Sequence, residues 1–248
     1  MTGEVRVIPL GGIPELVEGD DLGALLAEAA ERAGGLHDGD VVVVAQKAVS
    51  KVEGRVVRLA DVEPGPRART LAGPEGDPRH VEVILRESAE VVRSRPPLVI
   101  ARTRHGFVCA SAGVDASNAP GEGTLVLLPL DPDGSAARLR ARLRDLAGAD
   151  AAVVVSDSFG RAWRTGTTDV ALGVAGVVAL LDLRGTPDAS GRELASTQIA
   201  VADEIAGAAE LVMGKNRGVP AAIVRGVGLP GDGRAAELVL PLERDLFR

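Results

Sequence analysis

The sequence predicts an α+β fold with mixed sheets. Its strand-like and helical segments do not alternate strictly, whereas a purely parallel α/β sheet requires that alternation. In addition, residues 97–103 and 106–114 flank His105-Gly106, an arrangement that predicts a β-hairpin and therefore antiparallel strands. The 248-residue chain is 46% hydrophobic, enough to bury the core of one large domain or of two small interlocked ones.

The first part of the chain contains two predicted strands with a helix between them. Residues 5–10 and 38–46 are apolar runs of strand length, and the second reads DGDVVVVAQ, which predicts a strand buried on both faces. Between them, apolar residues recur with helical spacing. The pair Asp20-Asp21 offers an N-cap for this helix, and Gly34-Gly35 ends it.

The remaining elements follow from the same signals. A helix is predicted over residues 77–93, with Asp77 as its N-cap and Pro78 at its first position. A capped, arginine-rich helix is predicted over residues 131–148. The other predicted elements are, in chain order, a strand at 151–157, a strand within 174–185, a helix over 196–214 and a strand at 219–226.

Composition excludes several classes of protein. The formal net charge of −7 argues against a dedicated nucleic-acid binder. The single cysteine, Cys109, excludes an intrachain disulfide, and it lies in an apolar strand where a buried hydrophobe is expected rather than a nucleophile. The three histidines (His37, His80 and His105) lack metal-pair spacing. Without a signal peptide or an apolar run of roughly 20 residues, we expect a cytoplasmic protein.

Two carboxylates each come directly after a hydrophobic strand. Asp115 follows FVCASAGV, and Asp157 follows AAVVVS and precedes Ser158. Strand ends present side chains to a crevice, and convergent oxygen ligands suit Mg²⁺ or Mn²⁺. The alternative is that each aspartate only caps a turn, because aspartate is common in turns.

Basic residues near predicted strand ends are candidates for binding phosphate or carboxylate. Lys47 and Lys51 come just after the strand at 38–46, and Arg161 and Arg164 surround Trp163 in GRAWRTG. The alternative to a binding role is that these basic residues are solvated charges on the protein surface. For Trp163, the only tryptophan, a core or interface position is an equal alternative.

Glycine-rich segments do not identify a nucleotide site. No Walker A pattern occurs, which argues against a P-loop. Gly226, Gly228 and Gly231 have the G-x-G-x-x-G spacing, but Pro230 interrupts it and too little chain follows for a βαβ unit. Residues 11–14 (GGIP) are able to bring backbone N–H groups to a phosphate, although alone they indicate a turn.

Seven segments in order resemble the coenzyme F420-0:L-glutamate ligase family. They are PLGGIPELVEGDDL, GDVVVVAQKAVSKVEGR, GFVCASAGVDASN, LDPDGSAARLR, VVVSDSFGRAWRTG, VADEIAGAAELVMG and VPAAIVRG. The resemblance covers nearly the whole chain, and GVDASN, LDPDGSA and SDSFGR are specific in combination. It extends to stand-alone archaeal enzymes and to the N-terminal half of two-domain actinobacterial ones. We expect the stand-alone form, because no flavin-reductase-like domain follows residue 248.

The resemblance implies one ligase domain over residues 1–248, made of two interlocked subdomains in an intertwined homodimer. It implies GTP-driven addition of L-glutamate to coenzyme F420-0, and then of further γ-linked glutamates, through an acyl phosphate. The implied mechanism needs no side chain as a covalent nucleophile, so we expect no catalytic residue of that kind. The implied metal ligands are Asp115, Asp157 and Ser158. The implied GTP contacts are Gly11, Gly12, Ile13, Pro14, Gln46, Lys47, Lys51, Asn118, Met213, Gly214, Lys215, Asn216, Arg217, Gly218, Val219 and Pro220.

The implied cofactors are one or two divalent ions, Mg²⁺ or Mn²⁺, with K⁺ as an optional third. Archaeal members carry a metal-binding glutamate where this chain has Lys215, so the resemblance leaves open whether a second metal binds or Lys215 contacts phosphate. Two other functions stay open. One is a metal-dependent phosphotransferase or NTPase with another acceptor, and the other is a non-catalytic nucleotide-binding protein with the same fold.

Overall fold

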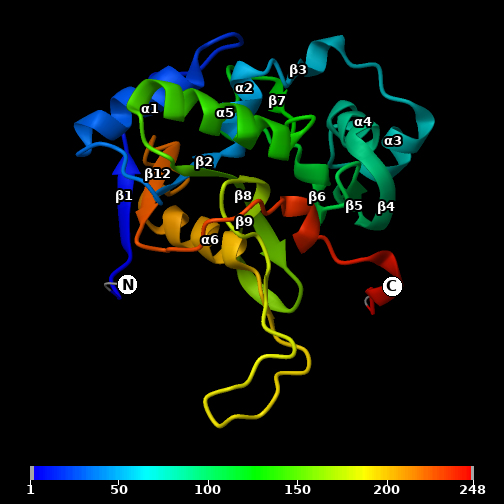
Figure 1. Cartoon of the computed structure of the whole chain (residues 1–248). Helices are drawn as coiled ribbons and strands as arrows, with labels where there is room; N and C mark the ends of the chain where they lie inside the picture. Colours follow the sequence, from blue (N-terminus) through cyan, green and yellow to red (C-terminus); the bar gives the residue numbers. More distant parts are fainter. Residues whose placement is uncertain (1–2, 247–248) are drawn as a thin grey trace.

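A five-stranded mixed sheet forms the centre of the computed structural model, which describes residues 3–246. The strand order is β1–β12–β2–β8–β9 (Figure 1). Only β2 and β8 are parallel, and the other neighbours are antiparallel. The strands are β1 (Arg6–Leu10), β2 (Val41–Ala45), β8 (Ala152–Arg161), β9 (Arg164–Ala175) and β12 (Ala221–Arg225). The predicted α+β class with mixed sheets is confirmed.

Helices cover both faces of this sheet (Figure 1). On one face, α1 (Leu22–Arg32) and α5 (Pro132–Ala147) pack on Val42 and Val44 of β2. On the other face, α6 (Val201–Met213) packs on Val41 and Val43. Successive valines of β2 therefore enter opposite cores, as the side-chain alternation of a strand requires. The prediction of a strand buried on both faces is confirmed.

A small lobe, formed by residues 56–126, has a hydrophobic core of its own and lies beside the sheet (Figure 1). Its β4–β5–β6 sheet contains the predicted hairpin across His105-Gly106. The elements of the lobe are β3 (Val56–Arg58), α3 (Pro66–Ala72), α4 (Pro78–Glu87), β4 (Ser88–Arg95), β5 (Leu98–Thr103), β6 (Val108–Ala110) and β7 (Thr124–Val126). The short elements elsewhere are α2 (Gln46–Val52), β10 (Leu181–Asp182) and β11 (Gln198–Ile199).

The predicted aspartate caps are confirmed. Asp21 accepts a hydrogen bond from the Ala24 N–H at 3.0 Å, and Asp77 accepts one from the Arg79 N–H at 2.8 Å. Asp131 accepts one from the Gly134 N–H at 3.0 Å. Each carboxylate satisfies a backbone donor that the first helical turn leaves without a partner. No helix within residues 3–246 combines the length and the apolar character that a membrane crossing needs.

Several predicted boundaries are wrong. The helix expected over residues 196–214 begins at Val201, because residues 198–199 form β11, and the strand expected over residues 106–114 ends at Ala110. The helix expected over residues 77–93 ends at Glu87, and residues 88–95 form β4 instead, because they pair with β5. The strand expected to end at residue 157 continues to Arg161 and turns back into β9. Asp157 therefore lies inside a strand of a long hairpin. Trp163 lies at the hairpin turn and is 80% exposed, which excludes the core position for this side chain.

Gly173 of β9 lies where the first turn of α5 crosses the sheet. A Cβ atom at this position would overlap the backbone carbonyl group of Pro132. We therefore expect Gly173→Ala to lower the free energy of unfolding by about 2–3 kcal/mol, because neither backbone moves without disturbing the core. Gly160→Ala in the same hairpin, where a Cβ has open space, is the control. Equal denaturant midpoints for the two variants would contradict this packing.

Candidate nucleotide and metal site

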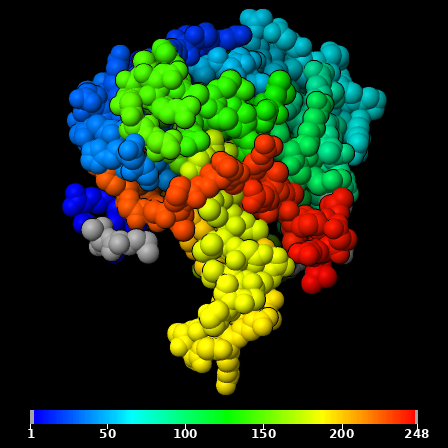
Figure 2. Space-filling view, in the orientation of Figure 1, coloured from blue at the N-terminus to red at the C-terminus, as the bar shows by residue number. Residues whose placement is uncertain are grey.

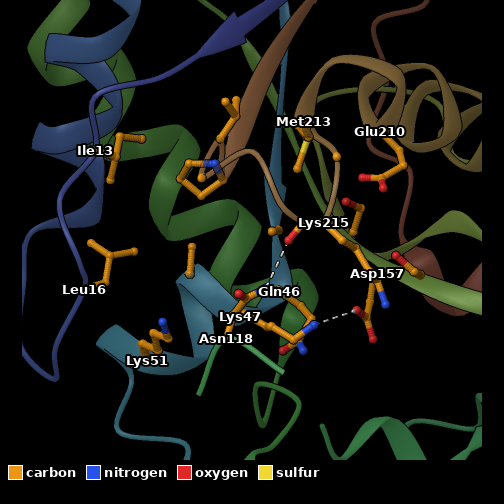
Figure 3. A pocket seen from close by; sticks show the side chains of 18 of the residues that line it. Ile13, Leu16, Gln46, Lys47, Lys51, Asn118, Asp157, Glu210, Met213 and Lys215 are labelled. Carbon is orange, nitrogen blue, oxygen red and sulfur yellow. Dashed lines mark hydrogen bonds and ion pairs between the residues drawn. The ribbon is translucent and has the colours of Figure 1, made fainter. Parts of the chain in front are cut away.

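A cavity of about 300 Å³ opens at the C-terminal end of β2, beside the middle of β8, and brings together most of the predicted site residues (Figure 3). It is enclosed by the loop after β1, the first turn of α2, the β8–β9 hairpin and the loop after α6. The lining residues are Ile13, Pro14, Glu15, Leu16, Ala45, Gln46, Lys47, Ala48, Lys51, Asn118, Ser156, Asp157, Ser158, Asp169, Glu210, Met213, Gly214, Lys215, Asn216, Gly218, Val219 and Pro220.

The parallel pairing of β2 and β8 places Lys47 close to Asp157. Ala45 and Ser156 are register partners in this pair. Lys47 follows two residues after Ala45, in the first turn of α2, and its Nζ lies 4.0 Å from Oδ1 of Asp157 (Figure 3). The pairing of the two valine runs ends at Ala45 and Ser156, so the residues that follow each run lie side by side.

Asp115 reaches the same lysine from the small lobe. Its Oδ2 lies 2.9 Å from Nζ of Lys47. Its carboxylate also accepts hydrogen bonds from the N–H and the hydroxyl of Ser117, at 2.7 and 2.8 Å. Asp115 therefore forms the turn that the alternative interpretation expected, and it also shares one ammonium group with Asp157. The two predicted acidic residues meet in the folded chain although 42 positions separate them in the sequence.

The two carboxylates differ in their ionisation. Burial raises the pKa of Asp157 to about 6; the charges of Asp169 and Asp115 act in the same direction, and Lys47 and the Ser158 N–H oppose them. Burial also disfavours the charged form of Asp115, but hydrogen bonds from Lys47 and Ser117 outweigh it and lower the pKa of Asp115. Both groups are therefore mostly ionised at neutral pH, and Asp157 takes up a proton first on acidification.

Two acidic residues of the cavity carried no sequence signal. Asp169 of β9 is 4% exposed and accepts hydrogen bonds from the hydroxyls of Ser156 and Ser158, at 2.9 and 2.7 Å. Burial raises the pKa of Glu210 in α6, and the charge of Asp169 adds to that effect. Recognition of the β8–β9 hairpin would have revealed Asp169, because it is the register partner of Ser158.

Three polar contacts shape the remaining wall. The Lys51 ammonium is 8% exposed and donates to a carboxylate oxygen of Glu15. Gln46 accepts a hydrogen bond from the Ser50 hydroxyl at 2.8 Å, while its buried Nε2 has no partner among the described residues. The Asn118 amide donates to the Lys215 carbonyl at 3.3 Å and links two loops across the cavity (Figure 3). The cavity thus offers amide and ammonium donors to an anionic ligand.

Some predicted residues lie outside the lining. The carbonyls of Gly11 and Gly12 accept hydrogen bonds from the Arg32 guanidinium, at 3.2 and 3.4 Å. Arg217 donates to the Leu211 carbonyl at 3.4 Å. Arg161 and Arg164 lie at the exposed end of the β8–β9 hairpin. The other predicted nucleotide contacts all border the cavity.

The donor set fits a divalent ion held jointly by protein and phosphate. Within residues 3–246, no cluster of three or more His, Cys, Asp or Glu side chains has the geometry of a metal cage. Mg²⁺, however, is usually bound by one or two carboxylates and completes its shell with water and substrate phosphates. Asp115, Asp157 and the Ser158 hydroxyl supply oxygen ligands of that kind beside the cavity.

The pKa of Asp157 predicts how metal affinity depends on pH. Below about pH 6 Asp157 becomes protonated, and a proton then competes with a cation for its oxygens. We expect the affinity for Mn²⁺ to fall by up to about tenfold for each pH unit below that value and to level off above it. Titration of the protein with Mn²⁺ across this range, followed by electron paramagnetic resonance, measures the effect. An affinity that does not change with pH would contradict the role of Asp157.

Comparisons with known proteins place the chain in one family. The family described as F420-0:Gamma-glutamyl ligase matches residues 12–226. Proteins named "Coenzyme F420:L-glutamate ligase" are 46% identical in Methanopyrus kandleri and 44% identical in Methanothermobacter thermautotrophicus. The first alignment covers 98% of both chains, and the second covers 98% of this chain and 99% of its relative. The protein of that name in Archaeoglobus fulgidus is 43% identical, with 98% of this chain and 96% of the relative aligned. This chain therefore belongs to the F420-0:Gamma-glutamyl ligase family.

Proposed function

We propose that this protein is a ligase that uses GTP to add L-glutamate to coenzyme F420-0, and then adds further γ-linked glutamates. One structural observation supports the proposal most strongly: Asp115 and Asp157 share the Lys47 ammonium at the edge of a cavity lined by donors. Phosphoryl transfer needs such a combination of metal ligands and cations, because negative charge is spread over the transferring group. The names of the relatives supply the acceptor and the amino acid.

The reaction proceeds in two steps. A carboxylate oxygen of the precursor attacks the γ-phosphorus of GTP, the bond to the β-phosphate oxygen breaks, and GDP leaves. The glutamate amine then attacks the carbonyl carbon of the acyl phosphate, inorganic phosphate leaves, and the nitrogen loses a proton. When bound, a divalent ion neutralises charge on the phosphate oxygens.

The side chains of the cavity bind and orient the reactants. Asp115, beside the cavity, and Asp157 and Ser158 in its lining would hold a divalent ion, and Lys47 would turn its ammonium to a phosphate oxygen. The unpaired Nε2 of Gln46 donates a hydrogen bond to the nucleotide. Lys215 lies in the loop after α6 at the cavity wall, where an ammonium suits phosphate better than a second metal.

We also propose that the protein is an intertwined homodimer. The segment between β9 and α6 projects from the body of the protein (Figure 2). Alongside the β8–β9 hairpin lies a mainly apolar cavity of about 510 Å³, bordered by Phe107, Phe159 and Leu240. A second copy would cover such a surface. Analytical ultracentrifugation tests this, and a monomer at micromolar concentration would contradict it.

Mass spectrometry of the reaction tests the proposed function. The purified protein is incubated with coenzyme F420-0, L-glutamate, GTP and Mg²⁺ or Mn²⁺, and the products are expected to increase in mass by whole glutamate units. Reactions with ATP in place of GTP, or without metal, are the controls. GTP hydrolysis that does not depend on the precursor would instead indicate another acceptor. Metal-dependent GTP binding without turnover would indicate a non-catalytic protein.

A further inference from the structure

Asp169 is a buried carboxylate at the wall of the cavity. It is 4% exposed, and no ion pair with a Lys or Arg engages it in the part of the chain that the structure describes. Among the described residues, the hydrogen bonds to its two oxygens come from the hydroxyls of Ser156 and Ser158. Burying an ionised carboxylate is costly unless a positive charge compensates it. This arrangement at a cavity wall is consistent with a positive ligand that binds nearby.

The hairpin fixes Asp169 opposite Ser158. The two residues are register partners in the antiparallel β8–β9 pair, and Ser156 lies two positions further along the same face of β8. The pairing shifts by one residue between Val155 and Ser156, where β9 has a bulge. The Asp203 carboxylate accepts a hydrogen bond from the Ala171 N–H at 2.8 Å beside this bulge. The bulge and its cap therefore set which residue of β9 faces the two serines.

The hydrogen bond from Ser158 to Asp169 determines which way the lone pairs of the Ser158 hydroxyl point. A hydroxyl has one hydrogen to donate and two lone pairs. Ser158 donates its hydrogen bond to Asp169, at an Oγ–Oδ1 distance of 2.7 Å. The lone pairs of Oγ therefore remain available to a cation, and the carboxylate increases their basicity. We propose that Asp169 is a positioning residue that orients the Ser158 hydroxyl towards the divalent ion. This inference rests on the metal use proposed above.

A double-mutant cycle tests the proposal by metal binding alone. Mn²⁺ affinity is measured by electron paramagnetic resonance in the presence of a non-hydrolysable GTP analogue for the wild type, Asp169→Asn, Ser158→Ala and the double variant. Asn keeps the shape of the side chain, but it removes the negative charge and replaces one of the two accepting oxygens with an NH₂ donor. We expect Asp169→Asn to weaken Mn²⁺ binding by about 10-fold or more in the wild-type background and by less than about 2-fold in the Ser158→Ala background.

Each outcome decides the proposal. An unchanged affinity in Asp169→Asn overturns it, and so does an equal loss in both backgrounds, because Asp169 then acts on the metal independently of Ser158. If the wild type does not bind Mn²⁺, both this inference and the proposed metal use fail. If it binds Mn²⁺ with the predicted coupling but makes no glutamylated product, only the proposed substrates fail.

Controls separate positioning from stability. Asp133 of α5 also holds β9, because its Oδ1 accepts hydrogen bonds from the N–H groups of Val174 and Ala235, at 2.8 and 3.0 Å. Asp133→Asn is expected to lower the melting temperature without changing Mn²⁺ affinity. Should Asp169→Asn not fold, Ser156→Ala provides a second test, because it loosens Asp169 and leaves Ser158 intact. We then expect Mn²⁺ to bind about 2- to 5-fold more weakly, and an unchanged affinity overturns the proposal.

Discussion

Asp157→Asn is expected to lower glutamate-dependent GDP release by about 10³-fold or more. The amide cannot compensate the charge of a divalent ion, and loss of that ion removes several kcal/mol of transition-state stabilisation. Asp115→Asn is expected to have the same effect, because both carboxylates contact the same ammonium and belong to one site. Steady-state GDP release with precursor and glutamate at saturation measures the loss.

Stability measurements distinguish a catalytic loss from misfolding. Burial raises the pKa of Asp157 from 3.8 to about 6 on folding. Between pH 3.8 and about pH 6, the folded state therefore binds a proton that the unfolded state has lost. The free energy of unfolding falls as the pH rises through this range, and above it the ionised carboxylate remains destabilising. Asparagine does not ionise, so Asp157→Asn should raise the free energy of unfolding at pH 8 by about 3 kcal/mol. Asp145→Asn on the exposed surface of α5 is the control.

Near-normal turnover in both Asp115→Asn and Asp157→Asn would refute the account.

Lys47→Met is expected to reduce turnover by about 10³-fold, the order of effect seen for cations that stabilise a transferring phosphoryl group. Methionine keeps the apolar stem in the largely buried position of Lys47 but removes the charge. It also leaves Asp115 and Asp157 without their shared ion-pair partner, so their mutual repulsion increases. The variant should therefore lose stability above about pH 6, where Asp157 ionises.

Lys215→Met is the matched comparison for Lys47→Met. Lys215 borders the same cavity but lies in the exposed loop after α6, where solvent screens its charge. We expect a smaller loss of about 3- to 10-fold, mainly as weaker apparent GTP affinity. Initial rates over a range of GTP concentrations separate the two effects. Comparable activity in Lys47→Met and the wild type would exclude a direct role for Lys47.

The two valine runs of the sequence were the strongest basis for predicting the fold and the site. They identify β2 and β8 as buried strands, and parallel pairing then brings Lys47 and Asp157 together. The helix caps were also predictable, because an aspartate before a helical pattern satisfies local backbone donors whatever the rest of the fold does. The strand-end position also singled out Asp115, the resemblance implied that it is a metal ligand, and the structure brings it to the same lysine from another part of the chain.

Most of the wrong predictions have one physical cause. In these segments, pairing with a neighbouring strand determines the secondary structure. Residues 88–95 continue a helical pattern, but their pairing with β5 makes them a strand. The sequence SDSFGRAWRTGTTD has no apolar alternation, so the extension of the β8–β9 hairpin was invisible. Asp169 was missed with it, since its contact with Ser158 exists only across the hairpin.

Anomalous diffraction at the manganese edge tests the central claim most directly. Crystals grown with Mn²⁺ and a non-hydrolysable GTP analogue are expected to show a peak that the oxygens of Asp115, Asp157 and Ser158 ligate together with a phosphate oxygen. The typical distance is about 2.0–2.2 Å, as for other small divalent ions with oxygen ligands. A manganese peak elsewhere in the molecule, with Lys47 still bound between the two aspartates beside the nucleotide, would contradict the account.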